Sequence, residues 1–180
     1  MNHEHTTLSY QVISYLLRYP NQQIVSTLGE LKQVINSLDD EIKQELVQFM
    51  DSIESISFDN WINHYIEIFD FGRQTSLYIT YLKLGEQRER GLELLKLKKY
   101  YEAHGFDITD EELPDYLPLI LEFCANVPKE TSSELLNMHI ESLEFTRKKL
   151  SENNSPYVHL FNTLLITMKN NKFPPLYKTQ

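Results

Sequence analysis

Cysteine and glycine are both scarce in this sequence of 180 residues, and the scarcity excludes several classes of protein. The single cysteine, Cys124, excludes an intrachain disulfide and indicates a reducing compartment. The opening Met-Asn-His-Glu-His lacks the basic and then apolar run of a secretory signal, and no window reaches about 18 apolar residues. We therefore expect a cytoplasmic protein without a membrane span.

The motifs of common enzymes are missing as well. There is no Gly-x-Gly pair and no Gly-x4-Gly-Lys, so the backbone cradle for a dinucleotide or triphosphate is not indicated. No His-Glu-x-x-His occurs, and no glutamate stands three residues before a histidine, as a helical di-iron site would require. Cys124 shares a helical face with Leu117 and Ile120, which favours a core thiol over a nucleophile. We expect no enzyme, no metal site and no stably bound cofactor.

Positive charge is in short supply, with 17 Lys and Arg against 26 Asp and Glu and a net charge of −9. Such a chain is repelled by nucleic acid and by anionic membrane surfaces. A basic or amphipathic protein segment is the partner that this charge favours.

What the sequence does contain is helical periodicity, with 41% hydrophobic residues and no run of strict apolar and polar alternation. The pattern predicts an all-α fold, a single-domain bundle of about eight or nine helices over residues 1–180, with a loose tail at about 171–180. Thr6 or Thr7 is the predicted cap of the first helix, Asp59 that of the fourth, and Gly105 follows the sixth. The predicted helices cover approximately 6–19, 22–38, 40–53, 59–70, 75–85, 86–104, 114–126, 131–150 and 156–168.

Three stretches in the middle of the chain form an ordered set of motifs. They read FDFGRQTSLYITYL at 69–82, GEQRERG at 85–91 and ELPDYLPLILEF at 112–123. Over residues 60–123 the sequence resembles the NarJ-type chaperones of respiratory nitrate reductase, within the redox-enzyme maturation proteins that include the TorD and DmsD types. The wider group tends to have Pro-Asp-His where this chain has Pro114-Asp115-Tyr116, so a cationic role does not transfer to Tyr116.

The resemblance implies an all-helical cytoplasmic accessory protein that assists molybdenum cofactor insertion and enzyme assembly. Its implied partner is the N-terminal segment of the apo catalytic (alpha) subunit of nitrate reductase, with molybdenum cofactor biosynthesis proteins as further candidates. Another molybdoenzyme, including one exported with a twin-arginine leader, is the alternative client, and an unassigned helical enzyme is the alternative from another class.

The helix expected from Pro114 supplies the first candidate for peptide binding. On a helical wheel Asp115 and Glu122 flank Leu119, and Tyr116 lies on the opposite, apolar side. Two carboxylates beside an exposed leucine suit a basic amphipathic segment. The alternative is that Asp115 stabilises the helix N-terminus while Glu122 is solvated.

The remaining candidates for the site lie in or near the motifs at 69–82 and 85–91. Tyr65, Tyr78 and Tyr81 combine a large apolar ring with a polar tip, which suits either the walls of a groove or packing between helices. Arg73 follows Asp70 by three residues and could pair with it. Arg88 and Arg90 belong to Gly-x-x-Arg-x-Arg-Gly and are either solvated charges or contacts with a cofactor or subunit.

Overall fold

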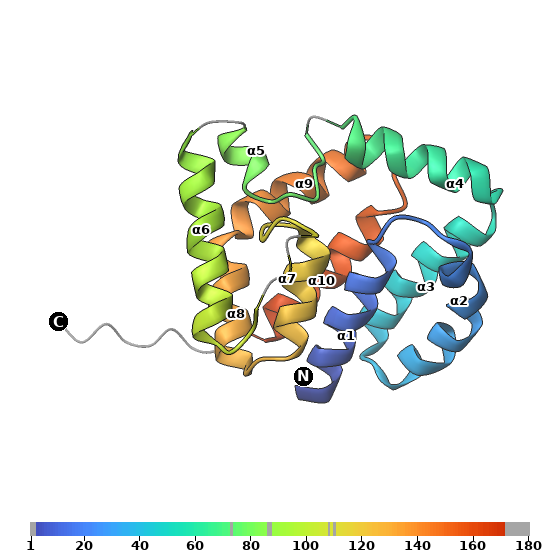
Figure 1. The fold of residues 1–180 in the computed structure, drawn as a ribbon. Helices are drawn as coiled ribbons and strands as arrows, with labels where there is room; N and C mark the ends of the chain where they lie inside the picture. The colour runs from blue at the N-terminus through green and yellow to red at the C-terminus, as the bar shows by residue number, and fades with distance from the viewer. Residues whose placement is uncertain (1–2, 73, 86–87, 108, 110, 172–180) are drawn as a thin grey trace.

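The computed structural model describes residues 3–72, 74–85, 88–107, 109 and 111–171. Ten α-helices and two other helical turns occur in these ranges, and they confirm the all-α prediction (Figure 1). Their bounds are α1 His3–Leu16, α2 Gln22–Val34, η1 Ile35–Ser37, α3 Asp40–Glu54, α4 Phe58–Tyr65, η2 Ile66–Asp70, α5 Tyr81–Leu84, α6 Arg88–Ala103, α7 Leu117–Ala125, α8 Lys129–Met138, α9 Ile140–Glu152 and α10 Val158–Asn170.

The first helices follow the turn chemistry of the sequence. A proline cannot continue a helix, and Pro20 separates α1 from α2. The Asn21 side chain accepts a hydrogen bond from the Ile24 N–H at 3.0 Å and caps α2. A 3-10 turn from Ile35 leads into α3, which buries one apolar face. The expected second helix is therefore present, with its last turn tightened.

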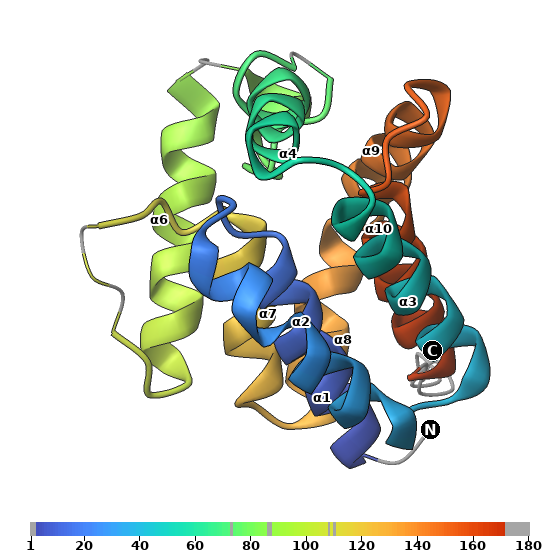
Figure 2. The same cartoon turned by 90° about the vertical axis from the view of Figure 1, so that its right-hand side faces the viewer.

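Helices distant in sequence form the core. α1 packs against α7 and α10, and α10 also packs against α3 and α9 (Figures 1 and 2). Trp61 is 2% exposed and donates its indole N–H to the Tyr157 hydroxyl at 2.8 Å, which joins α4 to the start of α10. Burial of Cys124 in α7 raises the pKa of its thiol, in agreement with a core role. These contacts join the N-terminal and C-terminal parts of the chain.

Four predicted helix boundaries were wrong. Thr6 and Thr7 do not cap the first helix, because α1 already includes His3 and both threonines lie within it. Ser57, not Asp59, caps α4, because the Ser57 hydroxyl accepts from the Asn60 N–H. The seventh helix begins at Leu117 and not near Pro114, and Pro118 lies in its first turn, where a missing N–H costs nothing. The expected eighth helix is two helices, α8 and α9, which meet at His139.

The predicted fifth helix was also too long. Only Tyr81–Leu84 forms a helical turn, and residues 75–80 run in turns and a short extended stretch. Gly72 precedes this stretch, where a Cβ atom would collide with the Ile68 carbonyl and the Thr75 hydroxyl. A residue without a side chain is needed for this close approach.

At the C-terminus, only the first residue of the predicted loose tail, about 171–180, is among the described residues. Asn171 is buried, and its amide lies 3.4 Å from the Ser133 hydroxyl of α8. The rest of the predicted tail, 172–180, lies outside the described residues.

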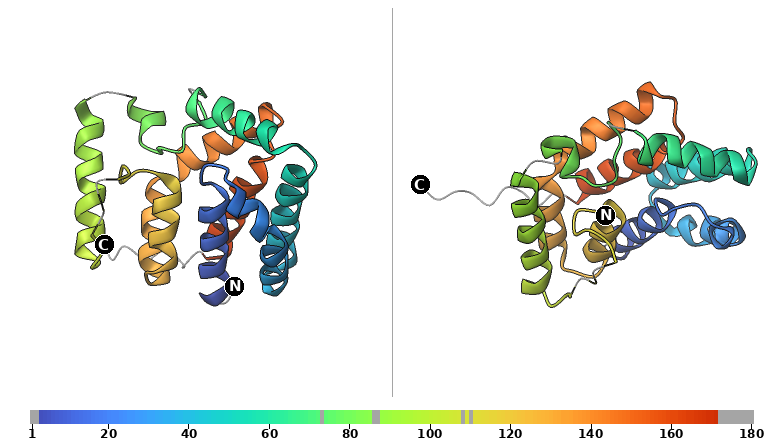
Figure 3. Two further views of the ribbon diagram at one scale, coloured as in Figure 1. Left: turned by 45° about the vertical axis from the view of Figure 1, so that its right-hand side comes forward. Right: turned by 45° about the horizontal axis from the view of Figure 1, so that its top comes forward.

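Helix α6 lies at one edge of the molecule (Figures 1 and 3). It buries only Leu97 and Tyr101, and Gly105, at φ 83°, follows its end as predicted. In the described part of the chain, no helix is long and apolar enough to cross a bilayer.

Candidate functional site

Two non-helical stretches lie against each other: residues 75–80, which precede α5, and residues 111–116, which precede α7. The Ile79 N–H donates to the Asp115 carbonyl at 3.0 Å, and the Leu117 N–H donates to the Leu77 carbonyl at 2.8 Å, so that Tyr78 and Tyr116 form an isolated antiparallel bridge. The residue before a proline avoids the helical conformation, which explains why the chain around Leu113 and Pro114 stays non-helical. This pairing places the motif at 69–82 against the Leu-Pro-Asp motif.

A buried ion pair holds these two stretches to α6. The Asp115 side chain is 0% exposed and lies 3.2 Å from the Arg90 guanidinium, whose side chain is 16% exposed. The same carboxylate accepts hydrogen bonds from the backbone N–H and the hydroxyl of Thr80. A buried carboxylate requires such partners, because an unpaired charge in the interior is costly.

Two tyrosine rings lie beside the ion pair of Arg90 and Asp115. The Arg90 guanidinium lies 5.4 Å from the centre of the Tyr81 ring and 6.0 Å from that of Tyr78, within the range of cation–π attraction. The Tyr78 ring in turn lies 5.4 Å from the Tyr116 ring, and its hydroxyl donates to Glu112 at 2.7 Å. Burial, and then this carboxylate, raise the pKa of Tyr78, so the hydroxyl remains a donor at neutral pH.

Tyr65 is the last of the predicted site residues that lie in this region. It is 4% exposed, donates to the Leu17 carbonyl at 3.2 Å, and packs edge-on against Tyr19 at 5.3 Å between ring centres. Electrostatic interaction with Tyr116 contributes, after burial, to the raised pKa of Tyr65. The structure thus brings together six of the predicted site residues, which we call the tyrosine–arginine cluster: Tyr65, Tyr78, Tyr81, Arg90, Asp115 and Tyr116.

The other predicted residues lie elsewhere. The predicted strip of Asp115, Leu119 and Glu122 was wrong, because Asp115 precedes α7 and points into the interior. Glu122 is exposed and pairs with Arg18 at 2.8 Å. Arg88 is exposed on α6, and Arg73 with its expected ion pair lies outside the described residues.

Leu119 and Glu122 line a different hollow, of about 330 Å³, between α7 and the end of α6 with the residues that follow it. Aromatic rings form much of its wall, with Phe106 and Phe123 at 5.2 Å between centres. We call it the aromatic hollow.

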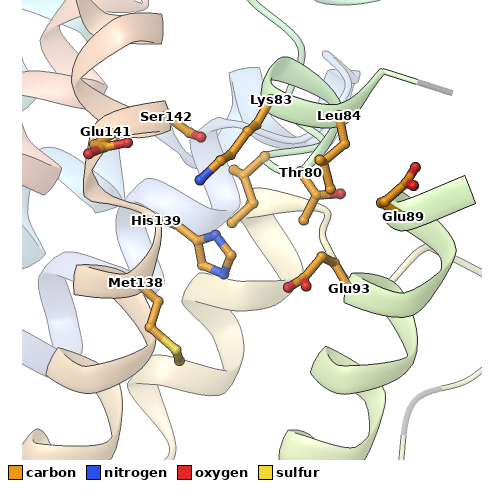
Figure 4. Close-up of a pocket in the computed structure, with 10 residues that line it drawn as sticks. Thr80, Lys83, Leu84, Glu89, Glu93, Met138, His139, Glu141 and Ser142 are labelled. Carbon is orange, nitrogen blue, oxygen red and sulfur yellow. The ribbon is translucent and has the colours of Figure 1, made fainter. Parts of the chain in front are cut away.

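A second cavity, of about 240 Å³, adjoins the tyrosine–arginine cluster through Thr80, and Figure 4 shows the side chains that line it. The cavity lies between α5 and α6 on one side and the junction of α8 and α9 on the other. Thr80 lines the cavity and also donates a hydrogen bond to Asp115 of the cluster. Three glutamates and one lysine give its wall a negative charge, and Met138 is 59% exposed beside them. We call it the acidic cavity; its lining is Ile79, Thr80, Lys83, Leu84, Glu89, Glu93, Met138, His139, Glu141 and Ser142.

His139 and Glu93 face each other across the acidic cavity (Figure 4). Burial lowers the pKa of His139, so the imidazole is neutral at neutral pH and adds no positive charge to the cavity. Lys83 in the lining, and Lys96 through its 2.6 Å pair with Glu93, offset only part of the negative charge of the three glutamates. The sequence analysis missed this cavity, because its residues come from three separate segments that only the fold brings together. The exposed Met138 and the junction at His139 carry no proline or glycine that could have marked them.

The acidic cavity combines carboxylates with apolar side chains, an arrangement that suits the recognition of a protein segment. Among the described residues, no group of three or more His, Cys, Asp or Glu side chains could hold a metal ion. The carboxylates of the acidic cavity attract cationic side chains by charge complementarity, and its apolar lining residues, Ile79, Leu84 and Met138, favour the burial of apolar side chains.

Comparison with known sequences gives consistent results. The profile of a family described as nitrate reductase delta subunit matches residues 35–163. The probable nitrate reductase molybdenum cofactor assembly chaperone NarJ of Bacillus subtilis (strain 168) is 37% identical over 171 residues, which are 94% of this chain and 93% of that protein. The nitrate reductase molybdenum cofactor assembly chaperone NarJ of Escherichia coli (strain K12) is 32% identical over 86% of this chain and 66% of its own length. The nitrate reductase-like protein NarX of Mycobacterium tuberculosis (strain ATCC 25618 / H37Rv) is 29% identical over 83% of this chain and 22% of its own length.

Proposed function

The chain belongs to the nitrate reductase delta subunit family, and on that premise we propose that it is an assembly chaperone for a nitrate reductase. It is a NarJ-type chaperone and not an enzyme. It binds the N-terminal segment of the apo catalytic subunit and keeps the enzyme open until the molybdenum cofactor is inserted. The names of its relatives support the chaperone role, and the acidic cavity supports the binding of a segment. The cytoplasmic compartment remains a prediction from the sequence.

The single observation that carries the binding step is the charge of the acidic cavity beside an exposed apolar side chain. Glu89 and Glu141 are exposed at its rim, and Met138 provides a flexible apolar contact that adapts to many partners. An amphipathic helix with cationic residues can direct its charges to these carboxylates and its apolar face to Met138 and Leu84. The net charge of −9 favours such a partner at longer range.

In this proposal the tyrosine–arginine cluster positions the cavity wall. Asp115 accepts from Thr80 and pairs with Arg90, so it connects the lining of the cavity to α6. Since the Asp115 carboxylate is 0% exposed and already paired, it acts through Thr80 and Arg90 rather than on a cation of the client.

Calorimetry with a synthetic peptide of the client's N-terminal segment tests the site. Glu89→Gln and Glu141→Gln should each weaken binding by a few tenths to about 1 kcal/mol at low salt, the usual value of a rim charge. The difference from wild type should vanish near about 1 M salt, where the Debye length is roughly 3 Å. Glu144→Gln is the matched control, because Glu144 is exposed on the same helix outside the cavity lining. Met138→Ala should weaken binding at every salt concentration.

Equal affinity of wild type and both carboxylate variants at low salt would exclude the acidic cavity. In that case Leu119→Ala tests the aromatic hollow as the binding site.

Deletion of the gene tests the chaperone function separately from the site. We expect nitrate reductase subunits to be synthesised at normal levels with little bound molybdenum, measured by metal analysis of the purified enzyme. Full molybdenum content in the deletion strain would refute the chaperone function, whatever the peptide experiments give.

A further inference from the structure

Helix α6 has a second exposed surface, directed away from the acidic cavity. Leu92 is 58% exposed and Leu95 is 49% exposed, and their spacing of three residues places them on one stripe of the helix. Arg88 stands four residues before the first leucine and Lys99 four residues after the second, and both are exposed. Figures 1 and 3 show α6 at the edge of the molecule, and the exposure of these four residues means that this outer stripe faces solvent.

The outer stripe is basic, in contrast to the chain as a whole. Lys96 and Lys98 stand beside the leucines, and the helix as a whole carries five cations against three glutamates, Glu89, Glu93 and Glu102. Lys96 lies 2.6 Å from Glu93, whereas Arg88 and Lys99 form no ion pair with any residue that the structure describes. A concentration of cations around two exposed leucines, in a protein with a net charge of −9, is an unusual surface.

Gly91 adds an observation that the fold does not explain. It lies within α6, it is exposed, and a Cβ atom added to it would meet nothing within 4 Å. A glycine in a helix is less favourable than alanine, and neither internal packing nor a positive φ requires one here. Gly91 stands four residues before Leu95, so it leaves the helix backbone accessible beside the leucines.

We infer that the outer stripe of α6 is a docking surface for an acidic amphipathic helix of a partner protein, separate from the acidic cavity. The leucines provide the apolar contact, the cations select the acidic partner, and Gly91 allows the two helix backbones to approach closely. The inference goes beyond the proposed function, because it assigns a second partner to the opposite side of α6.

Other occupants fit the surface less well. A symmetric dimer through this stripe would bring two identical basic surfaces together. An extended anionic membrane surface would face the acidic remainder of the protein as well as the stripe, whereas a single helix contacts the stripe alone. Lipid headgroups also gain nothing from a bare helix backbone. A packed acidic helix uses all three features of the stripe.

Titration with a synthetic amphipathic peptide of leucine and glutamate, followed by fluorescence anisotropy, tests the inference. The double variant Leu92→Ser/Leu95→Ser should weaken its binding about tenfold or more, and Lys99→Glu should weaken it in a salt-dependent way. The same peptide with lysine in place of glutamate should bind independently of these substitutions, because its charge suits the acidic cavity.

Gly91→Ala separates docking from folding. It should raise the midpoint of thermal unfolding by about 2–4 °C, because alanine favours the helix, and should nevertheless weaken binding of the acidic peptide. Gly29→Ala is the matched control: Gly29 is also helical and exposed, its Cβ position is also empty, and the substitution should stabilise α2 without changing peptide affinity.

Three results would overturn the inference. The first is binding of the acidic peptide that is unchanged by the leucine substitutions or by Gly91→Ala. The second is binding to phosphatidylglycerol vesicles, with no binding of the peptide. The third is a dimer in sedimentation equilibrium that the leucine substitutions dissociate.

Discussion

Removal of the Arg90 charge should destabilise the protein far more than removal of a surface arginine. In Arg90→Met the Asp115 carboxylate, at 0% exposure, loses its cation and stays in the interior. Breaking one side of a buried pair in this way typically costs about 3–5 kcal/mol. Arg18→Met is the matched control, since its pair with Glu122 is shorter, 2.8 Å against 3.2 Å, but is 49% and 57% exposed. An exposed pair contributes about 0–1 kcal/mol, so burial and not distance decides the difference.

Urea unfolding followed by Trp61 fluorescence measures both effects, because the only tryptophan is 2% exposed and reports on the core. With a slope of about 2 kcal/mol per molar urea, Arg90→Met should lower the midpoint by roughly 1.5–2.5 M and Arg18→Met by less than about 0.5 M. The double variant Arg90→Met/Asp115→Asn should be more stable than Arg90→Met, because the introduced amide is neutral and its oxygen can still accept from Thr80. Equal midpoints for the two methionine variants would refute the reasoning.

Three further predictions concern the core and its titration. Trp61→Ala should cost about 3–5 kcal/mol by circular dichroism in urea, since it leaves a cavity and an unpaired Tyr157 hydroxyl; an unchanged midpoint would mean that the indole is not buried. Cys124 should resist Ellman's reagent in the native protein and react at once in guanidinium at the same pH, because burial raises its pKa and blocks access; rapid native reaction would contradict this. Burial lowers the pKa of His139 below its usual 6.5, so the unfolded chain takes up the proton first and stability should fall as the pH drops below about 6.5; His139→Gln should reduce that fall, and an identical pH profile would refute the assignment.

The helices of this fold could be predicted well wherever local chemistry marks their ends. The second helix begins at Gln22 as predicted, after Pro20, and Gly105 follows α6 as the preference for glycine after a helix predicts. The junction of α8 and α9 at His139 has no such mark, and apolar residues continue across it. A break of that kind follows from packing against the rest of the core.

The members of the tyrosine–arginine cluster could be predicted but its geometry could not, and the acidic cavity was not predicted at all. The helical wheel that placed Asp115 on an exposed strip with Leu119 assumed that the helix begins at Pro114. In the structure α7 begins only at Leu117, and the backbone at 115–117 is hydrogen-bonded to residues 77–79. The partner of Tyr78 is Tyr116, 38 positions further along the sequence, and periodicity within one segment contains no information about such a pair. Arg90 was a plausible solvated charge until the fold placed a buried carboxylate beside it.

Helix α6 also has a consequence for the local opening of the structure. Only Leu97 and Tyr101 of its 16 residues are buried, whereas seven of the nine residues of α7 are buried. Elements with few buried apolar side chains open without unfolding of the whole domain, so the amide protons of α6 should exchange with solvent deuterium well before those of α7. Because both proposed binding surfaces include α6, a client in the cavity or a helix on the outer stripe would each slow exchange there. The two could then be told apart by the second element protected: the junction of α8 and α9 for the cavity, and α6 alone for the stripe.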